Sequence, residues 1–148
     1  MLLTATATPE VIDDMCSKFD ISRDAVTVTG FYRRNLRLFV ESVPSDGKDR
    51  RLCELLKNSP DEPSIVYVTL QKTAEEVAAH LKEKGINAAA YHAGMEDTAR
   101  KDIQDSFMRG ETNCIVATIA FGMGIDKRNI RRVIHYNLPK SIENYSQE

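Results

Sequence analysis

The fold is decided by residues 115–126, Ile-Val-Ala-Thr-Ile-Ala-Phe-Gly-Met-Gly-Ile-Asp. The apolar residues 114–117 predict a buried strand, which opens into a turn with two closely spaced glycines and an aspartate. We call residues 118–126 the glycine turn. In open α/β sheets, ligands bind beyond the carboxyl ends of the strands. We therefore expect a ligand site at the glycine turn.

Three residues of the glycine turn are candidates for ligand contact. Thr118 offers a hydroxyl, Gly124 a bare backbone and Asp126 a carboxylate. Glycine allows a close approach of the backbone or a positive φ. A tight turn in which the glycines serve geometry alone is equally compatible with the spacing, because the full dinucleotide fingerprint Gly-x-Gly-x-x-Gly is absent.

The composition is that of one ordinary domain in an intracellular protein. The 148 residues include 20 Lys and Arg against 22 Asp and Glu, so a globally basic nucleic-acid binder is not indicated. The three cysteines are unclustered, which is typical of reduced thiols and gives no zinc-ligand spacing. No apolar run approaches the ~20 residues that span a bilayer.

From residue 48 onward, strand patterns alternate with helical patterns of 10–13 residues. Such alternation predicts an α/β fold with a parallel sheet covered on both faces. The expected strands are Ser64–Val68, Ala88–Tyr91, 114–117 and Val133–Tyr136.

The first part of the chain is less regular. Thr8 and Pro9 predict a helix start, and residues 26–29 and 36–40 have strand patterns. A boundary near Gly30 would make residues 1–30 the tail of a preceding domain. The alternative is one sheet of seven strands, including a strand at the very start.

Two histidines and a basic run complete the candidates. His92 follows a strand, where it contacts a ligand or caps a neighbouring carbonyl, and His135 is expected to be a satisfied core imidazole. The basic side chains after the glycine turn suit phosphate contacts or a solvated rim. They are Lys127, Arg128, Arg131, Arg132 and Lys140.

Several segments resemble the conserved motifs of the RecQ family of superfamily 2 DNA helicases. Residues 3–8 are similar to motif III, 64–67 to motif IV and 116–127 to motif V. Tyr91–Met95 resembles the block between them, and residues 133–141 and 145–148 match the approach to motif VI. The resemblance covers essentially the whole chain.

The resemblance implies a RecA-like, P-loop NTPase-type helicase C-terminal domain with a parallel sheet. Residues 1–30 would be the C-terminal tail of the first RecA-like domain, and 31–148 the second, truncated before motif VI. The family usually has Phe-Asp-Arg-Pro-Asn-Leu where residues 31–36 are Phe-Tyr-Arg-Arg-Asn-Leu, so the entry to the second domain has lost a stiff proline.

The implied activity is ATP-dependent 3′–5′ DNA unwinding in recombination, replication and repair. ATP and Mg²⁺ would be bound mainly by the first RecA-like domain of the same chain, and the partners would be single-stranded and forked duplex DNA. No membrane partner is expected. The protein would lie in a eukaryotic nucleus or in the bacterial cytoplasm and nucleoid.

The resemblance also assigns roles to individual residues. Thr4 and Thr6 would couple the ATP state to DNA contact, and Thr118 and His92 would lie on the DNA side. Gly124 and Asp126 would face ATP. An RNA helicase of the same superfamily and a non-catalytic nucleotide- or nucleic-acid-binding module remain as alternatives.

We predict that the 148-residue chain by itself does not hydrolyse ATP. It contains no Gly-x-x-x-x-Gly-Lys phosphate cradle, no DEAH-type acidic pair and no Gly-Arg-Ala-Gly-Arg segment with its arginine finger. An arginine finger alone contributes ~10³–10⁵ in rate to related phosphoryl transfers. Phosphate release by the purified chain, with and without DNA, measures this, and DNA-stimulated turnover would contradict it.

Overall fold

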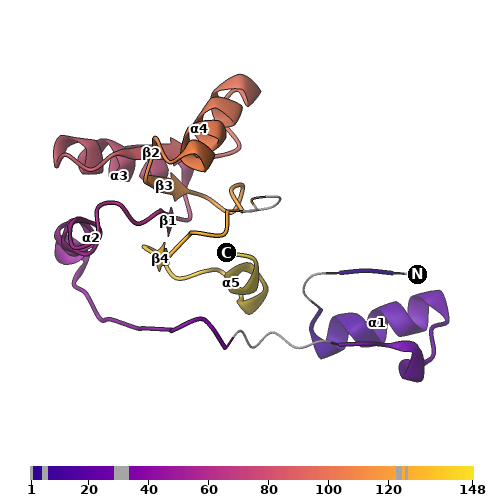
Figure 1. Ribbon diagram of the computed structural model, residues 1–148. Helices are drawn as coiled ribbons and strands as arrows, with labels where there is room; N and C mark the ends of the chain where they lie inside the picture. Colours follow the sequence, from indigo (N-terminus) through magenta and orange to yellow (C-terminus); the bar gives the residue numbers. More distant parts are fainter. Residues whose placement is uncertain (1, 5–6, 29–33, 123–124, 126) are drawn as a thin grey trace.

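The computed structural model describes residues 2–4, 7–28, 34–122, 125 and 127–148. Its sheet has four parallel strands in the order β2-β3-β1-β4 (Figure 1). The strands are β1 (Ser64–Tyr67), β2 (Ala88–Tyr91), β3 (Cys114–Ala117) and β4 (Arg132–His135). The parallel α/β sheet that the sequence predicted is therefore confirmed.

The second, third and fourth of the described helices pack on the sheet, and the third and fourth connect successive strands. The described helices are α1 (Pro9–Phe19), α2 (Lys48–Lys57), α3 (Gln71–Glu83), α4 (Asp97–Arg109) and α5 (Ile142–Gln147). Glycines with positive φ follow two of them, Gly85 at +78° after α3 and Gly110 at +79° after α4. A left-handed residue at this position satisfies the last carbonyls of a helix, and glycine adopts it without strain.

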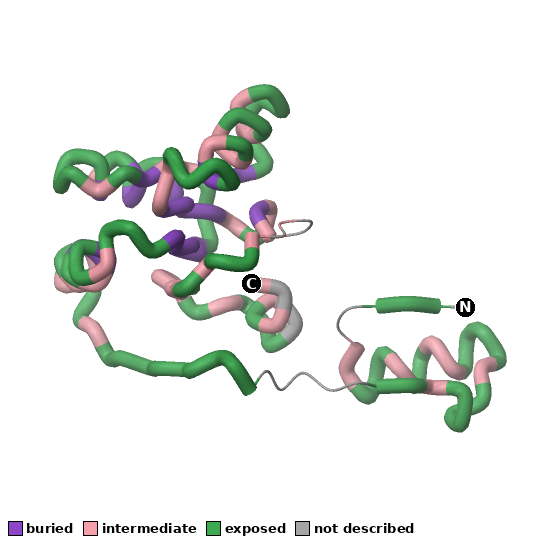
Figure 2. Tube along the Cα trace, in the orientation of Figure 1, coloured by how far each residue is buried: buried purple, intermediate pink, exposed green. Residues whose placement is uncertain are grey.

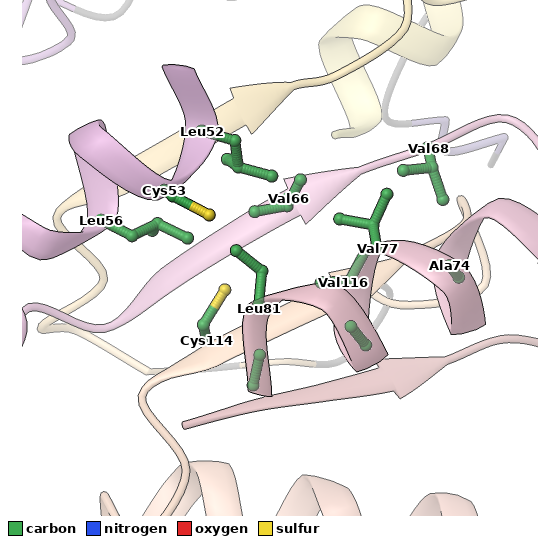
Figure 3. Close-up of a cluster of buried hydrophobic side chains, with 12 residues drawn as sticks. Leu52, Cys53, Leu56, Val66, Val68, Ala74, Val77, Leu81, Cys114 and Val116 are labelled. Carbon is green, nitrogen blue, oxygen red and sulfur yellow. The ribbon is translucent and has the colours of Figure 1, made fainter. Parts of the chain in front are cut away.

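One face of the sheet packs against α2 and α3. Leu52 and Leu56 of α2 and Val77 and Leu81 of α3 converge on strand side chains such as Val66 (Figure 3). The two buried cysteines lie in the same cluster, and burial raises the pKa of the Cys114 thiol to about 12. These thiols are packing groups in the part of the chain that the structure describes.

The opposite face packs against α4. Phe107 of α4 is fully buried, and its ring meets that of Phe121 edge-on at 5.8 Å between centroids. Ile65, Tyr67 and Ile115 belong to this cluster. Successive strand residues thus alternate between the two faces, as the pleat of a strand requires.

Residues before Leu52 contribute no buried side chain among those described (Figure 2). Helix α1 begins as predicted, with Thr8 as its N-cap accepting a hydrogen bond from the Val11 amide at 3.4 Å. Residues 2–4, 26–28 and 36–40 do not form strands in the described part of the chain, so the strands expected there are wrong, and Thr29 lies outside the described residues. Alternating residues favour a strand, but a strand also needs a partner. The seven-strand sheet is wrong for the same reason.

None of the described helices has the length and apolar character that a bilayer crossing requires.

We predict that Phe107→Ala destabilises the chain by about 3–5 kcal/mol, the range for removing a fully buried phenylalanine. Met108→Ala is the matched control, because Met108 is the next residue of α4 and is 40% exposed. Surface changes of that kind usually fall within about 0.5 kcal/mol. Urea unfolding of both variants measures the difference, and equal losses would show that α4 does not pack as described.

Candidate functional site

All four strands end at one edge of the sheet. Tyr67 of β1 lies in register with Ala117 of β3 and His135 of β4, and Tyr91 of β2 also pairs with Ala117. The residues that follow these ends therefore gather at this carboxyl edge. His92 and Thr118, both expected to contact a ligand, are brought together there.

Thr118 is fixed by its backbone on both sides. Its amide donates to the Tyr91 carbonyl at 3.2 Å, and its own carbonyl accepts from the Phe121 amide at 3.1 Å. The residue is half-buried. Its backbone is thus held between β2 and the glycine turn, and the partly exposed residue lies at the carboxyl edge.

The beginning of the glycine turn is anchored by aromatic residues. Phe121 is buried and packs edge-on against Tyr91 with 4.8 Å between ring centroids. The Tyr67 hydroxyl donates to the Phe121 carbonyl at 2.9 Å. Gly122 has a φ of +134°, a conformation that L side chains rarely adopt, so this glycine has a geometric role. Gly124 and Asp126 lie outside the described residues, and their roles stay predictions.

The His92 side chain is buried, with 4% of the residue exposed. Its Nε2 lies 3.1 Å from Oε1 of Glu75 on α3, whereas Nδ1 has no partner in the described part of the chain. The Gln71 amide closes the space beside Gly94, where a Cβ would lie 2.4 Å from Oε1 of Gln71. A direct ligand contact by the imidazole would require this group to open, so that role stays a prediction.

His135 differs from the expected satisfied core imidazole. It lies on the edge strand β4 and is half-buried. Its Nε2 is 3.0 Å from Oε2 of Glu148, at ion-pair distance, but the two are not aligned for a hydrogen bond. Burial lowers the pKa of His135 and raises that of Glu148, so both groups shift toward their neutral forms.

The basic run divides into two groups. Lys127 donates to the Met108 carbonyl at 3.1 Å and lies over the Phe107 ring, 5.3 Å from its centroid. Arg132 bonds the Leu55 carbonyl and the Glu62 carboxylate. These two side chains are half-buried and are held by contacts within the protein. Arg128, Arg131 and Lys140 are exposed.

Four further polar residues lie near the carboxyl edge and were missed from the sequence. The Thr69 amide lies 3.4 Å from the Asn137 side-chain oxygen, which joins the ends of β1 and β4. Gln71 and Glu75, from the start of α3, approach His92. Their position in the sequence could have indicated two of them, since Thr69 and Asn137 each directly follow a predicted strand.

The N-terminal threonines are only partly covered. Thr4 is exposed, and Thr6 lies outside the described residues. Their coupling role stays a prediction. Among the described residues, no group of three or more His, Cys, Asp or Glu side chains is arranged to hold a metal ion.

Comparison with known proteins agrees with this architecture. Residues 47–148 match the model of the helicase conserved C-terminal domain. The ATP-dependent DNA helicase RecQ of Bacillus subtilis is 45% identical over all of this chain, which covers 25% of that protein. The mouse bifunctional 3′-5′ exonuclease/ATP-dependent helicase WRN is 40% identical over 99% of the chain, which covers 11% of it.

A solved structure shows the same fold. A variant of S. cerevisiae Dbp5 bound to RNA and ADP BeF3 superposes with a TM-score of 0.82 at 21% identity, covering 97% of this chain and 39% of that one. The fold is therefore that of a RecA-like helicase C-terminal domain. The chain belongs to the helicase conserved C-terminal domain family, and it is similar over its whole length to proteins named RecQ. It spans about a quarter of the length of the bacterial relatives.

Proposed function

We propose that the longer protein containing this chain is an ATP-dependent DNA helicase that unwinds duplexes in the 3′–5′ direction. The observation that carries the proposal is the 45% identity, over the whole chain, to a protein named as an ATP-dependent DNA helicase. Residues 1–30 would close the first RecA-like domain, and 31–148 would form the second. The protein would act inside the cell on single-stranded and forked DNA.

The carboxyl edge of the sheet supplies the proposed nucleic-acid contact. Thr118 lies there at the end of β3, half-buried and held by backbone hydrogen bonds on both sides. A hydroxyl in such a rigid setting can donate to a phosphate oxygen and so position a strand without selecting its sequence. His92 lies beside it and would act after the Glu75 contact opens.

The nucleotide would be shared with the first RecA-like domain. Gly124 and Asp126 would face ATP, with Asp126 near the ribose, and Mg²⁺ would be held mainly by the other domain. Thr4 and Thr6 would couple the state of the nucleotide to DNA contact. The residues described here supply positioning, while the phosphate-binding lysine and the metal-binding acids would come from the first domain.

Comparing the unwinding of DNA and RNA duplexes by the full-length protein tests the proposal. DNA unwinding that requires ATP hydrolysis is expected. An RNA helicase of the same superfamily would unwind RNA instead, and a binding module would unwind neither.

We predict that Thr118→Val weakens binding of single-stranded DNA by the full-length protein. Valine is nearly isosteric, so the loss reflects one hydroxyl hydrogen bond, about 0.5–1.5 kcal/mol. The loss should be the same for different DNA sequences. Thr112→Val is the matched control, because Thr112 is also half-buried but lies at the amino end of β3. Fluorescence anisotropy measures both, and unchanged affinity in the first variant would assign Thr118 to packing.

We predict that Asp126→Ala impairs ATP-dependent unwinding more than it impairs DNA binding. Removing a charged hydrogen-bond acceptor costs about 1.5–3 kcal/mol. Strand-displacement rates at varied ATP concentration, with DNA affinity measured in parallel, separate the two effects. Normal unwinding with a collapse of DNA affinity would place Asp126 on the DNA side.

A further inference from the structure

Tyr67 makes one contact with its ring and another with its hydroxyl. The residue ends β1 and is 2% exposed. Its hydroxyl donates to the Phe121 carbonyl at 2.9 Å, and its ring stacks on His135 with 5.7 Å between centroids and 20° between planes. A phenylalanine would fill almost the same volume, so packing alone does not explain the hydroxyl. Burial, with the nearby Glu148, raises the pKa of Tyr67 to about 12, so the hydroxyl remains a donor at neutral pH.

The hydroxyl fixes the peptide group between Phe121 and Gly122. The Phe121 ring is already held by Tyr91 and Phe107. These ring contacts do not fix the Phe121 carbonyl. The next residue, Gly122 at φ +134°, has no side chain to restrict rotation of the peptide group. The Tyr67 hydrogen bond therefore sets the direction of the Phe121 carbonyl, just before Gly122.

His135 connects this anchor to α5. Its ring lies 5.1 Å from that of Tyr145, centroid to centroid, at an interplanar angle of 49°. Its Nε2 lies 3.0 Å from Oε2 of Glu148, just after the end of α5. His135 therefore contacts both α5 and its C-terminal neighbour Glu148 on one side and the Tyr67 ring on the other.

We propose that Tyr67 is a positioning residue that holds the Phe121–Gly122 peptide group at the start of the glycine turn and, through His135, makes this hold depend on the placement of α5. Its effect on nucleotide rests on the proposed helicase function, whereas its effect on the turn does not. Displacement of α5 would move His135 against the Tyr67 ring and so weaken the hold on the Phe121 carbonyl. A structural change near α5 would then alter nucleotide binding at the turn.

The chain offers a close control. Tyr136, one residue after β4, also has a pKa raised to about 12, and its hydroxyl donates to Oδ1 of Asp49 at 2.8 Å. Tyr136→Phe removes an equivalent hydrogen bond that does not reach the glycine turn. A general loss of stability would affect both variants, whereas a positioning effect would appear in Tyr67→Phe alone.

The experiment compares Tyr67→Phe and Tyr136→Phe in the full-length protein. Hydrogen–deuterium exchange of a peptide covering residues 118–127 reports on the turn, and the KM for ATP reports on its use. For Tyr67→Phe we expect exchange and KM each to rise about threefold to tenfold, the effect of one buried hydrogen bond, with kcat changing less. Tyr136→Phe should leave both values near wild type.

The two measurements separate the inference from the proposed function. Unchanged exchange in Tyr67→Phe, or an equal rise in Tyr136→Phe, overturns the positioning role. Faster exchange with an unchanged KM overturns the link to nucleotide. A wild-type protein without ATPase activity overturns the helicase proposal, and the exchange result alone then decides whether Tyr67 positions the turn.

A second pair of variants tests the dependence on α5. His135→Phe keeps an aromatic ring against Tyr67 but loses the approach to Glu148, so exchange should rise in α5 and, to a smaller extent, in the turn. His135→Ala removes both contacts, so exchange should rise in both segments. A rise confined to α5 in His135→Phe would show that the turn does not depend on α5.

Discussion

The parallel pairing of β1 with β3 on one side and β4 on the other is the constraint on which the rest of this structure depends. It places β1 inside the sheet, where its residues must pack on both faces. It also ends all four strands at one edge, because β2 is in register with β3. The polar residues after the strands therefore meet there, although they are far apart in the sequence.

The two faces of β1 have different consequences. Val66 faces the packing of α2 and α3, a cluster of apolar side chains that includes the Cys114 thiol (Figure 3). Tyr67 belongs to the cluster on the other face, and its hydroxyl reaches the glycine turn. The alternation along one short strand thus separates a region that provides stability from one that orients the candidate site.

Membership of the helicase conserved C-terminal domain family and the shape of the sheet agree on where a ligand would bind. The carboxyl edge is the expected place in an open parallel sheet. The structure adds that internal contacts already order the described part of this edge: Glu75 contacts His92, and Tyr67 holds the Phe121 carbonyl. These contacts must be kept or exchanged when ligand binds, which makes them the natural points at which binding could be regulated.

The sequence by itself determined the parallel α/β fold, the four strands of the sheet and the start of α1, because these follow from local patterns of apolar residues and helix caps. It also placed Thr118 and His92 beyond strand ends. The tertiary structure decided which patterns became strands: residues 36–40 alternate in part but pair with no strand among the residues that the structure describes. It also decided that His92 meets Glu75 and that Lys127 caps α4 rather than a ligand. Pairing and burial depend on residues distant in the chain, which local periodicity does not encode.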